Sequence, residues 1–407
     1  MTAGKTALII GGGITGPVAA IALRKAGIEA TIYEAYDKRA DNVGGVLFIG
    51  TNGLDALAAI DVLEATHGHG LPTPRVSIYN GGGKLLCTTP TSLPLADGIT
   101  TTSFKRAELY RVLHQEAARR GIRTELGKRL TRITESTDSI TAHFADGTEA
   151  SADILIGADG IRSTVREIID PAASKPRYTG LVAFAGFAPN PALPPDRDTY
   201  KMAFGKNAFF WYFVPDPRQA WWEVNMPSKE PLSREQILAE GIDTWSRRLI
   251  QLFQEDKSPA AQILGAQGED LLCIGAQYDL PSARSWHRGR MAIVGDAAHA
   301  VSPSSGQGAS MAVESAVTLA RCLRDCINPD EAFRTYERLR RNRVDRVLAF
   351  GAKRTASKAV GPFTAFLRDS LHGLGLRHLY QPEADAWLLR HHIDWDSTVK
   401  TELAAAA

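Results

Sequence analysis

The stretch that decides the fold is residues 7–34, ALIIGGGITGPVAAIALRKAGIEATIYE. Four apolar residues predict a short buried strand, residues 11–16 spell G-x-G-x-x-G, and an Ala/Leu/Ile helix precedes a second strand that ends in Glu34. One glycine permits the tight turn, the next lets backbone approach a pyrophosphate, and the third lets the helix pack against the strand. The helix N-terminus favours phosphates, and Glu34 can accept hydrogen bonds from a ribose. A glycine-rich turn without a ligand is the alternative, but the strand, helix, strand and acid together favour dinucleotide binding.

The composition indicates a globular protein of two domains. The chain has 407 residues, 44% of them hydrophobic, and 47 Lys and Arg against 45 Asp and Glu. That balance argues against a nucleic-acid or acidic-membrane surface, and no apolar run reaches the ~20 residues of a membrane helix. Cys322 and Cys326 lack the further Cys or His neighbours of a metal site, so we expect reduced cysteines and no metal. The first strand starts too close to Met1 for a signal peptide. We expect a cytoplasmic monomer or homodimer.

Two further apolar strands end in loops rich in glycine. Residues 153–156 lead into 157–160, Gly-Ala-Asp-Gly, and residues 291–294 lead into 295–308, which opens with Gly-Asp. We call residues 11–16, 157–160 and 295–308 the first, second and third glycine loops. Ligands collect at the carboxyl ends of parallel strands, so the three loops can converge on one long cofactor.

The third glycine loop suits a flavin. Asp296 can bind a sugar or polyol hydroxyl at the end of its strand. Gly306 and Gly308 precede a helix, and their bare backbone can lie beside a planar ring and donate N–H groups to it. A flavin needs such donors because its N1/O2 edge becomes negative on reduction.

The remaining pattern predicts an α/β fold. Helices are expected at 105–120, 233–265, 309–326 and 331–358, and a small β-meander at 122–157. The last helix is rich in arginine, which usually marks a solvated helix face.

Eight aromatic residues fall within 204–222. In the strand at 209–214 the odd-numbered residues face one way and the even-numbered residues the other, and both sets are apolar. Helices or a flat ligand must therefore cover both faces of this sheet. We predict a Rossmann-like domain, a mostly antiparallel β domain and a helical C-terminal segment. The predicted divisions are 1–70, 98–172 and 273–350 for the first domain, 71–97 and 173–272 for the second, and 351–407 for the tail.

These motifs together resemble a known family, the single-component FAD-dependent monooxygenases of the p-hydroxybenzoate hydroxylase type, or class A flavoprotein hydroxylases. The first glycine loop with Glu34 matches the family's ADP-binding motif, and residues 157–166 match its DG motif. The third glycine loop, with Gly-Asp at its start and Gly-Gln-Gly near its end, matches the GD motif. Arg106 opens a helix where the family carries an arginine that helps hold the FAD. The departures are Ala300, where proline is frequent, and Ser310, where asparagine is common.

The resemblance implies which residues bind tightly held, non-covalent FAD. Glu34 would bind the adenosine ribose, Arg106 the pyrophosphate region and Asp296 the ribityl chain, and Asp159 would support the FAD site and transient NAD(P)H use. His299 belongs to the loop motif and is assigned no proton transfer. The implied cofactor-binding residues are Gly11, Gly13, Ile14, Thr15, Gly16, Glu34, Arg106, Asp159, Asp296, Pro303, Gly306, Gln307 and Gly308.

The resemblance also implies the reaction. NAD(P)H reduces the FAD, O2 adds to the reduced ring as a C4a-hydroperoxide, and one oxygen atom goes to an aromatic or polycyclic small molecule. The aromatic-rich sheet is the expected substrate pocket, with Phe210, Tyr212 and Asn225 as its lining residues, and no catalytic base is identified. A flavin-dependent halogenase is one alternative, although Val224 and Met226 alter the W-x-W-x-I-P motif of that family. A non-catalytic flavoprotein that sequesters a small molecule is the other.

Overall fold

The three strands predicted to precede the glycine loops lie side by side in one sheet. The computed structural model describes residues 5–38, 44–267, 272–358 and 385–405. The strands of this sheet are β1 (Thr6–Ile10), β2 (Glu29–Tyr33), β8 (Arg123–Glu125), β12 (Ile154–Gly157), β18 (His287–Arg288) and β19 (Met291–Ile293). Their order is β18-β19-β12-β1-β2-β8, and all neighbours are parallel except β18 and β19. The carboxyl ends of β1, β12 and β19 therefore meet at one edge of the sheet, as predicted.

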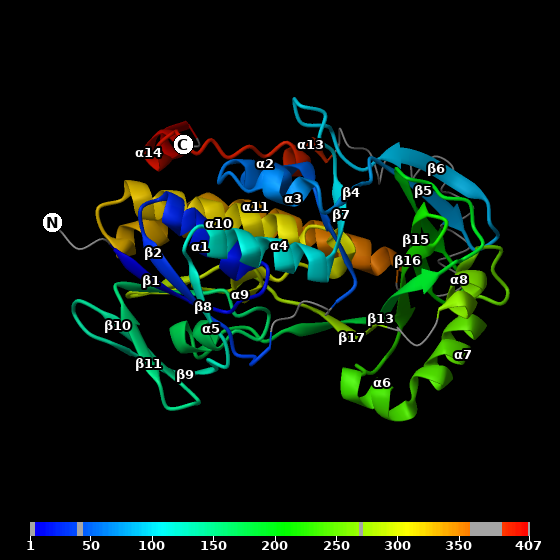
Figure 1. Cartoon of the computed structure of the whole chain (residues 1–407), viewed down its shortest axis with the longest axis horizontal. Coiled ribbons are helices and arrows are strands. Elements are labelled where there is room, and N and C mark those ends of the chain that lie inside the picture. Colours follow the sequence, from blue (N-terminus) through cyan, green and yellow to red (C-terminus); the bar gives the residue numbers. More distant parts are fainter. Residues whose placement is uncertain (1–4, 39–43, 268–271, 359–384, 406–407) are drawn as a thin grey trace.

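The helices of this domain pack on the parallel sheet or on one another. They are α1 (Thr15–Lys25), α2 (Thr51–Ala58), α3 (Leu63–His67), α4 (Arg106–Arg119), α5 (Thr164–Ile169), α9 (Asp296–His299), the 3-10 turn η1 (Pro303–Ser305) and α10 (Gly308–Asp325). Helix α1 is buried without interruption from Gly16 to Leu23 and packs against β2, α4 and α10 (Figure 1). The predicted meander is the antiparallel sheet β9 (Leu130–Glu135), β10 (Ile140–Phe144) and β11 (Glu149–Ala152), on the other side of the parallel sheet.

A second, seven-stranded sheet lies at the far end of the molecule (Figure 1). Its strands are β5 (Arg75–Asn80), β6 (Leu85–Pro90), β13 (Arg177–Pro189), β14 (Thr199–Phe204), β15 (Phe209–Asp216), β16 (Gln219–Pro227) and β17 (Leu272–Asp279). Their order is β17-β13-β16-β15-β14-β5-β6, and only β14 and β5 are parallel. The predicted domain boundaries stay predictions, but the pairing of β17 with β13 favours moving the boundary predicted at 272/273 to a position after Asp279.

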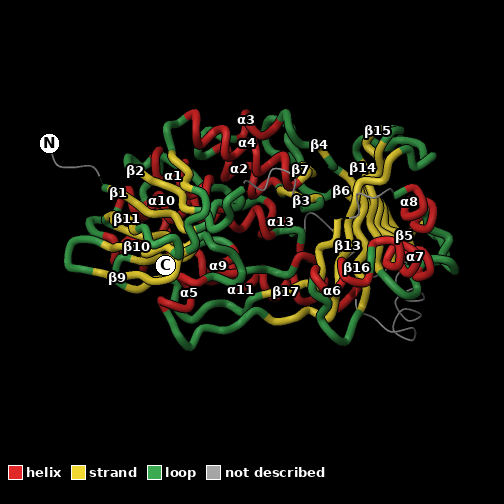
Figure 2. The backbone as a smooth tube through the Cα atoms, turned by 60° about the horizontal axis from the view of Figure 1, so that its bottom comes forward, coloured by secondary structure: helices red, strands yellow, loops and turns green. Residues whose placement is uncertain are grey.

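Helices cover one face of the seven-stranded sheet. They are α6 (Arg234–Glu240), α7 (Ile242–Leu252) and α8 (Ala260–Ala266), and Figure 2 shows α7 and α8 on the outer side of the strands. Phe210, Trp222 and Val224 form one core cluster with Trp245 and Leu249 of α7. The opposite face of the sheet turns toward the first domain, where a small sheet of β3 (Val46–Ile49), β4 (Leu71–Pro72) and β7 (Thr102–Lys105) adjoins it.

The long arginine-rich helix is α11 (Pro329–Lys358), and its arginines correct the prediction of a solvated face. Arg340 is 1% exposed, and its guanidinium lies 2.7 Å from the carboxylate of Glu314, which is wholly buried in α10. Arg343 lies at the same distance from the other oxygen of Glu314. Arg334 at the outer face is more than half exposed, so only part of the helix meets solvent as expected.

Two short helices, α13 (Ala386–Leu389) and α14 (Val399–Ala405), complete the described C-terminal segment. Residues 359–384 of the predicted helical tail lie outside the described residues. The predicted fold class, an α/β FAD-type domain with an antiparallel β domain and C-terminal helices, is confirmed. In the described part of the chain, no helix has the length and apolar character needed to span a bilayer.

Candidate active site

A cavity of about 500 Å3 lies where the three glycine loops meet, and we call it the central cavity. One side is formed by Gly13, Ile14 and Thr15 of the first loop, Ala158 and Gly160 of the second, and Asp296, Val301 and residues 303–309 in and after the third. The opposite side, which we call the sheet wall, consists of Tyr200, Met202, Trp211 and Glu223 from the seven-stranded sheet. Arg106 at the start of α4 and two residues at the end of α11, Arg354 and Lys358, also line the cavity.

The first glycine loop is held at its base by close backbone contacts. Gly12 N donates a hydrogen bond of 2.6 Å to the Glu34 carboxylate, and Tyr36 N donates one of 3.0 Å to the other oxygen. A Cβ on Gly16 would lie 2.0 Å from the carbonyl oxygen of Gly11, so the turn requires glycine there. A Cβ on Gly13 would meet no atom within 4 Å, because that position opens into the central cavity. Glu34 thus holds the first glycine loop in place, in addition to its predicted binding of the ribose.

The second glycine loop contacts the cavity through backbone, while Asp159 faces its own loop. The Asp159 carboxylate accepts hydrogen bonds from the Ser163 hydroxyl and from Val165 N (3.1 Å), at the start of α5. Burial raises the pKa of Asp159 above its usual value, against the lowering effect of these hydrogen bonds. Asp159 does not line the central cavity, unlike its neighbours Ala158 and Gly160. Its predicted support of the cofactor would therefore act through the shape of the loop.

Arg166 joins the residue that follows the second glycine loop to the third glycine loop. Its buried guanidinium donates hydrogen bonds of 3.0 Å to the Ala297 carbonyl and 2.8 Å to the Ile161 carbonyl. Arg166 was part of the matched motif but was given no role from the sequence. Its placement shows that the motif also fixes one loop against the other.

Asp296 begins the third glycine loop and points its carboxyl group at the central cavity. Protein atoms surround the group on its other sides, and this burial raises the pKa of Asp296 to about 6, although Arg106 opposes the shift. The Asp296 side chain nevertheless has solvent-accessible surface, because the cavity is open in front of it. A hydroxyl donor in the cavity would stabilise its charged form.

Buried side chains hold the end of the third loop. Asn52 donates a hydrogen bond of 3.1 Å to the amide oxygen of Gln307 and one of 2.6 Å to the carboxylate of Glu314. His299 is buried with its Nε2 2.8 Å from Ser315 Oγ, and burial, with Arg340, lowers its pKa to about 3. His299 does not line the central cavity, which agrees with assigning it no proton transfer.

The cavity fits a flavin nucleotide. A Cβ added at Gly13, Gly160 or Gly306 would meet no atom within 4 Å, so each of these backbones lies bare toward the cavity. Ser304 Oγ is buried at the cavity without a hydrogen-bond partner in the described structure. Bare backbone, an orphan hydroxyl and the Asp296 carboxyl are the groups that a planar ring with a polyol chain would contact. The individual cofactor-binding roles stay predictions.

Two predicted substrate residues lie away from the central cavity. Phe210 and Tyr212 pack on the helix-covered face of β15, with Phe210 at 0% exposure in the cluster under α7, so neither lines the central cavity. Trp211, one position away, faces the cavity instead. Asn225 lies on the cavity side of β16 but is covered, and it contacts Lys358, which lines the cavity. No local sequence signal identified Lys358, because it lies 133 positions from Asn225.

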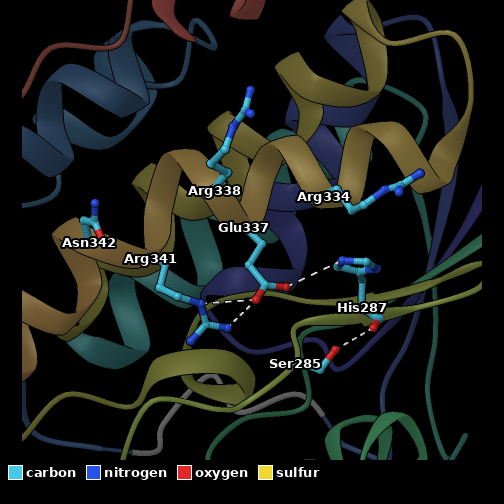
Figure 3. Close-up of a pocket in the computed structure, with 7 residues that line it drawn as sticks. All are labelled: Ser285, His287, Arg334, Glu337, Arg338, Arg341 and Asn342. Atoms are coloured by element: carbon cyan, nitrogen blue, oxygen red, sulfur yellow. Dashed lines mark hydrogen bonds and ion pairs between the residues drawn. The ribbon is translucent and has the colours of Figure 1, made fainter. Parts of the chain in front are cut away.

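A second cavity, of about 470 Å3, lies on the outer side of α11 and is a less suitable site (Figure 3). Its lining groups pair with one another: Glu337 forms an ion pair with Arg341 and lies 3.6 Å from His287. Its lining includes no residue of the three glycine loops. Among the residues that the structure describes, no cluster of His, Cys, Asp or Glu is arranged to hold a metal ion.

Comparisons with known proteins agree with this geometry. The sequence signature of a family described as FAD binding domain matches residues 5–208 and 276–351. A FAD-dependent urate hydroxylase of Klebsiella pneumoniae is 30% identical over 86% of this chain and 89% of its own. The aurachin C monooxygenase/isomerase of Stigmatella aurantiaca is 31% identical over 79% of this chain and 82% of its own. The crystal structure of Klebsiella pneumoniae HpxO complexed with FAD and uric acid superposes with a TM-score of 0.80 at 25% identity, covering 95% of each chain. The chain therefore belongs to the class A FAD-dependent aromatic monooxygenases, and FAD is its cofactor.

Proposed function

We propose that this monooxygenase binds a planar aromatic molecule between the sheet wall and the end of the third glycine loop, and there adds one oxygen atom from O2 to its ring. One observation carries the proposal: the three glycine loops and the aromatic sheet wall share a single cavity. Bound FAD supplies the electron transfer from NAD(P)H and the activation of O2. The relative complexed with uric acid, a planar bicyclic compound, supports a substrate of this shape.

The residues of the sheet wall would orient the substrate and exclude water. Trp211 is 5% exposed and is held by edge contacts with Phe48, at 5.4 Å between ring centroids, and with Tyr200, at 6.3 Å. An aromatic ring fixed in this way gives a substrate ring a flat apolar surface. Exclusion of water protects the activated oxygen from side reactions that release peroxide.

We expect Trp211→Leu to lower substrate affinity several-fold, since an aromatic contact contributes about 0.5–1.5 kcal/mol, and to increase the fraction of NAD(P)H that yields peroxide. Phe210→Leu is the matched control, because this neighbouring residue lies on the other face of the same strand. Both variants should melt at lower temperature than the wild type, since both remove buried aromatic volume. Equal effects of the two changes on affinity and peroxide yield would contradict the placement of the substrate at Trp211.

The reaction itself is tested with oxygen isotopes. The purified FAD-loaded protein is given NAD(P)H, a panel of aromatic compounds and isotopically labelled O2, with and without chloride or bromide. The product of a true substrate should contain one labelled oxygen atom whether or not halide is present. A halogenated product would support the halogenase alternative, and label found only in water would show that the enzyme does not oxygenate its ligand.

A further inference from the structure

The C-terminal end of α11, orange in Figure 1, brings a lysine to the sheet wall. Lys358 Nζ lies 3.2 Å from Asn225 Oδ1 in β16 and 4.1 Å from the centroid of the Phe209 ring in β15. Lys358 also lines the central cavity. Its amine is therefore held from two sides by the sheet and faces the space assigned to the substrate.

The Asn225 amide is oriented by hydrogen bonds to two charged side chains, Glu223 and Lys358. Its Nδ2 donates a hydrogen bond of 2.6 Å to Glu223 Oε1, so the amide oxygen is turned toward Lys358. Asn225 is wholly buried, whereas Glu223 lines the cavity beside Lys358. The amide thus spaces the carboxylate from the amine, and within the described residues Lys358 forms no ion pair with a carboxylate.

Two charged side chains, Glu223 and Arg354, act on the Lys358 amine. Arg354 lies one turn earlier on α11 and pairs with Asp385 at 3.3 Å, and Glu223 approaches from β16. Burial lowers the pKa of Lys358 to about 8, Glu223 opposes this shift, and Arg354 adds to it. An amine with this pKa exchanges protons readily near neutral pH.

We infer that Lys358 binds an ionisable hydroxyl group of the aromatic substrate and accepts its proton. This inference rests on the proposed function, because it concerns the substrate of the same cavity. In the step, the neutral amine form of Lys358 accepts the proton: the substrate O–H bond breaks, an N–H bond forms on Nζ, and an aryl oxide remains beside the resulting ammonium group. No electron leaves or enters in this step, and the proton returns to the product's oxygen before release. The negative oxygen enriches the ring in electrons, which favours transfer of oxygen to it.

The competing explanation is that Lys358 only balances the charge of Glu223. In that case its replacement would lower stability and would leave the choice between ligands unchanged. Ligand preference and melting temperature must therefore be measured on the same variants.

The experiment compares ionisable compounds with methyl ethers of the same shape. The probes are 4-nitrophenol against 4-nitroanisole, and 2,4-dihydroxyquinoline against 2,4-dimethoxyquinoline. Their affinities for the FAD-loaded protein are measured from the change in flavin absorbance. We expect the wild type to prefer at least one hydroxy compound over its ether by roughly 10- to 100-fold, the range for a hydrogen bond to a charged group.

Lys358→Gln should reduce that preference to about twofold or less, because the amide has neither the charge nor the basicity of the amine. Lys353→Gln is the matched control, since Lys353 lies exposed on the same helix, and it should keep the wild-type preference. Equal affinity of the wild type for both members of each pair, including no binding of any of them, would overturn the inference. So would an unchanged preference in Lys358→Gln. If the proposed oxygenation were at fault instead, the hydroxyl preference would hold and the isotope experiment would fail.

Discussion

Glu314→Gln should lower the free energy of unfolding by about 3–5 kcal/mol, the usual cost of leaving a buried ion pair without one partner. Glu314 is wholly buried, and its two oxygens lie 2.7 Å from the guanidinium groups of Arg340 and Arg343. Gln keeps the size of the side chain but leaves both cations without a counter-charge. The measurement is urea denaturation of the FAD-loaded variant at neutral pH.

The pH dependence of the loss follows from the same contacts. Burial alone would raise the pKa of Glu314, but Arg340 and Arg343 hold it well below its usual value of 4.5. A carboxylate with a depressed folded pKa contributes its stability above the unfolded pKa and loses it as the pH falls toward the folded pKa. The difference between wild type and variant should therefore be full above pH 4.5 and shrink below it.

Asp330→Asn is the control for Glu314→Gln. Asp330 and Arg334 both lie on helix α11 and form an ion pair, but their side chains are more than half exposed. An exposed pair contributes less than about 1 kcal/mol, so this variant should unfold close to the wild type. Similar losses in the two variants would show that burial of the Glu314 cluster does not determine its contribution.

Gly16→Ala should give a protein that is destabilised and free of FAD. The new Cβ would lie 2.0 Å from the carbonyl oxygen of Gly11, which is backbone and cannot rotate away. Forcing an extra methyl group into such a packed site costs about 1–3 kcal/mol, and more where the backbone cannot shift. Thermal unfolding and the ratio of flavin to protein absorbance measure the two effects.

Gly13→Ala separates folding from cofactor binding. Its Cβ would meet no protein atom within 4 Å and would project into the central cavity. The variant should fold with the stability of the FAD-free wild type but bind FAD more weakly. Full FAD occupancy in Gly13→Ala would remove Gly13 from the cofactor contacts, and wild-type stability of Gly16→Ala would show that the first loop can relax.

The elements that the sequence predicted best depend on local signals. Apolar strands followed by glycine loops were placed correctly because strand, turn and helix start are each written in a few adjacent residues. The β-meander at 122–157 was predicted for the same reason, and its turn residue Gly147 adopts a positive φ of 82°. The family, the cofactor and the reaction class were predicted from the family resemblance that these motifs carry.

The sequence could not determine which face of β15 meets the cavity. Alternation with a period of two defines two faces, and both carry aromatic residues, so Trp211 and Phe210 were equivalent until the helices were placed. The buried arginines of α11 were missed because their partner, Glu314, lies on another helix. Lys358 was missed because its partner, Asn225, lies in a strand 133 positions away. Cytoplasmic location and oligomeric state stay predictions.

Within one turn, helix α11 contacts both the third glycine loop and the seven-stranded sheet. Thr355 Oγ1 lies 2.5 Å from Ser302 Oγ in the third glycine loop, and Lys358, three residues later, contacts the seven-stranded sheet through Asn225. Three residues of α-helix rise only about 4.5 Å. Helix α11 thus ties the third glycine loop to the seven-stranded sheet through contacts that lie within a single helical turn. A one-residue insertion between these positions would rotate the Lys358 amine about 100° away from Asn225.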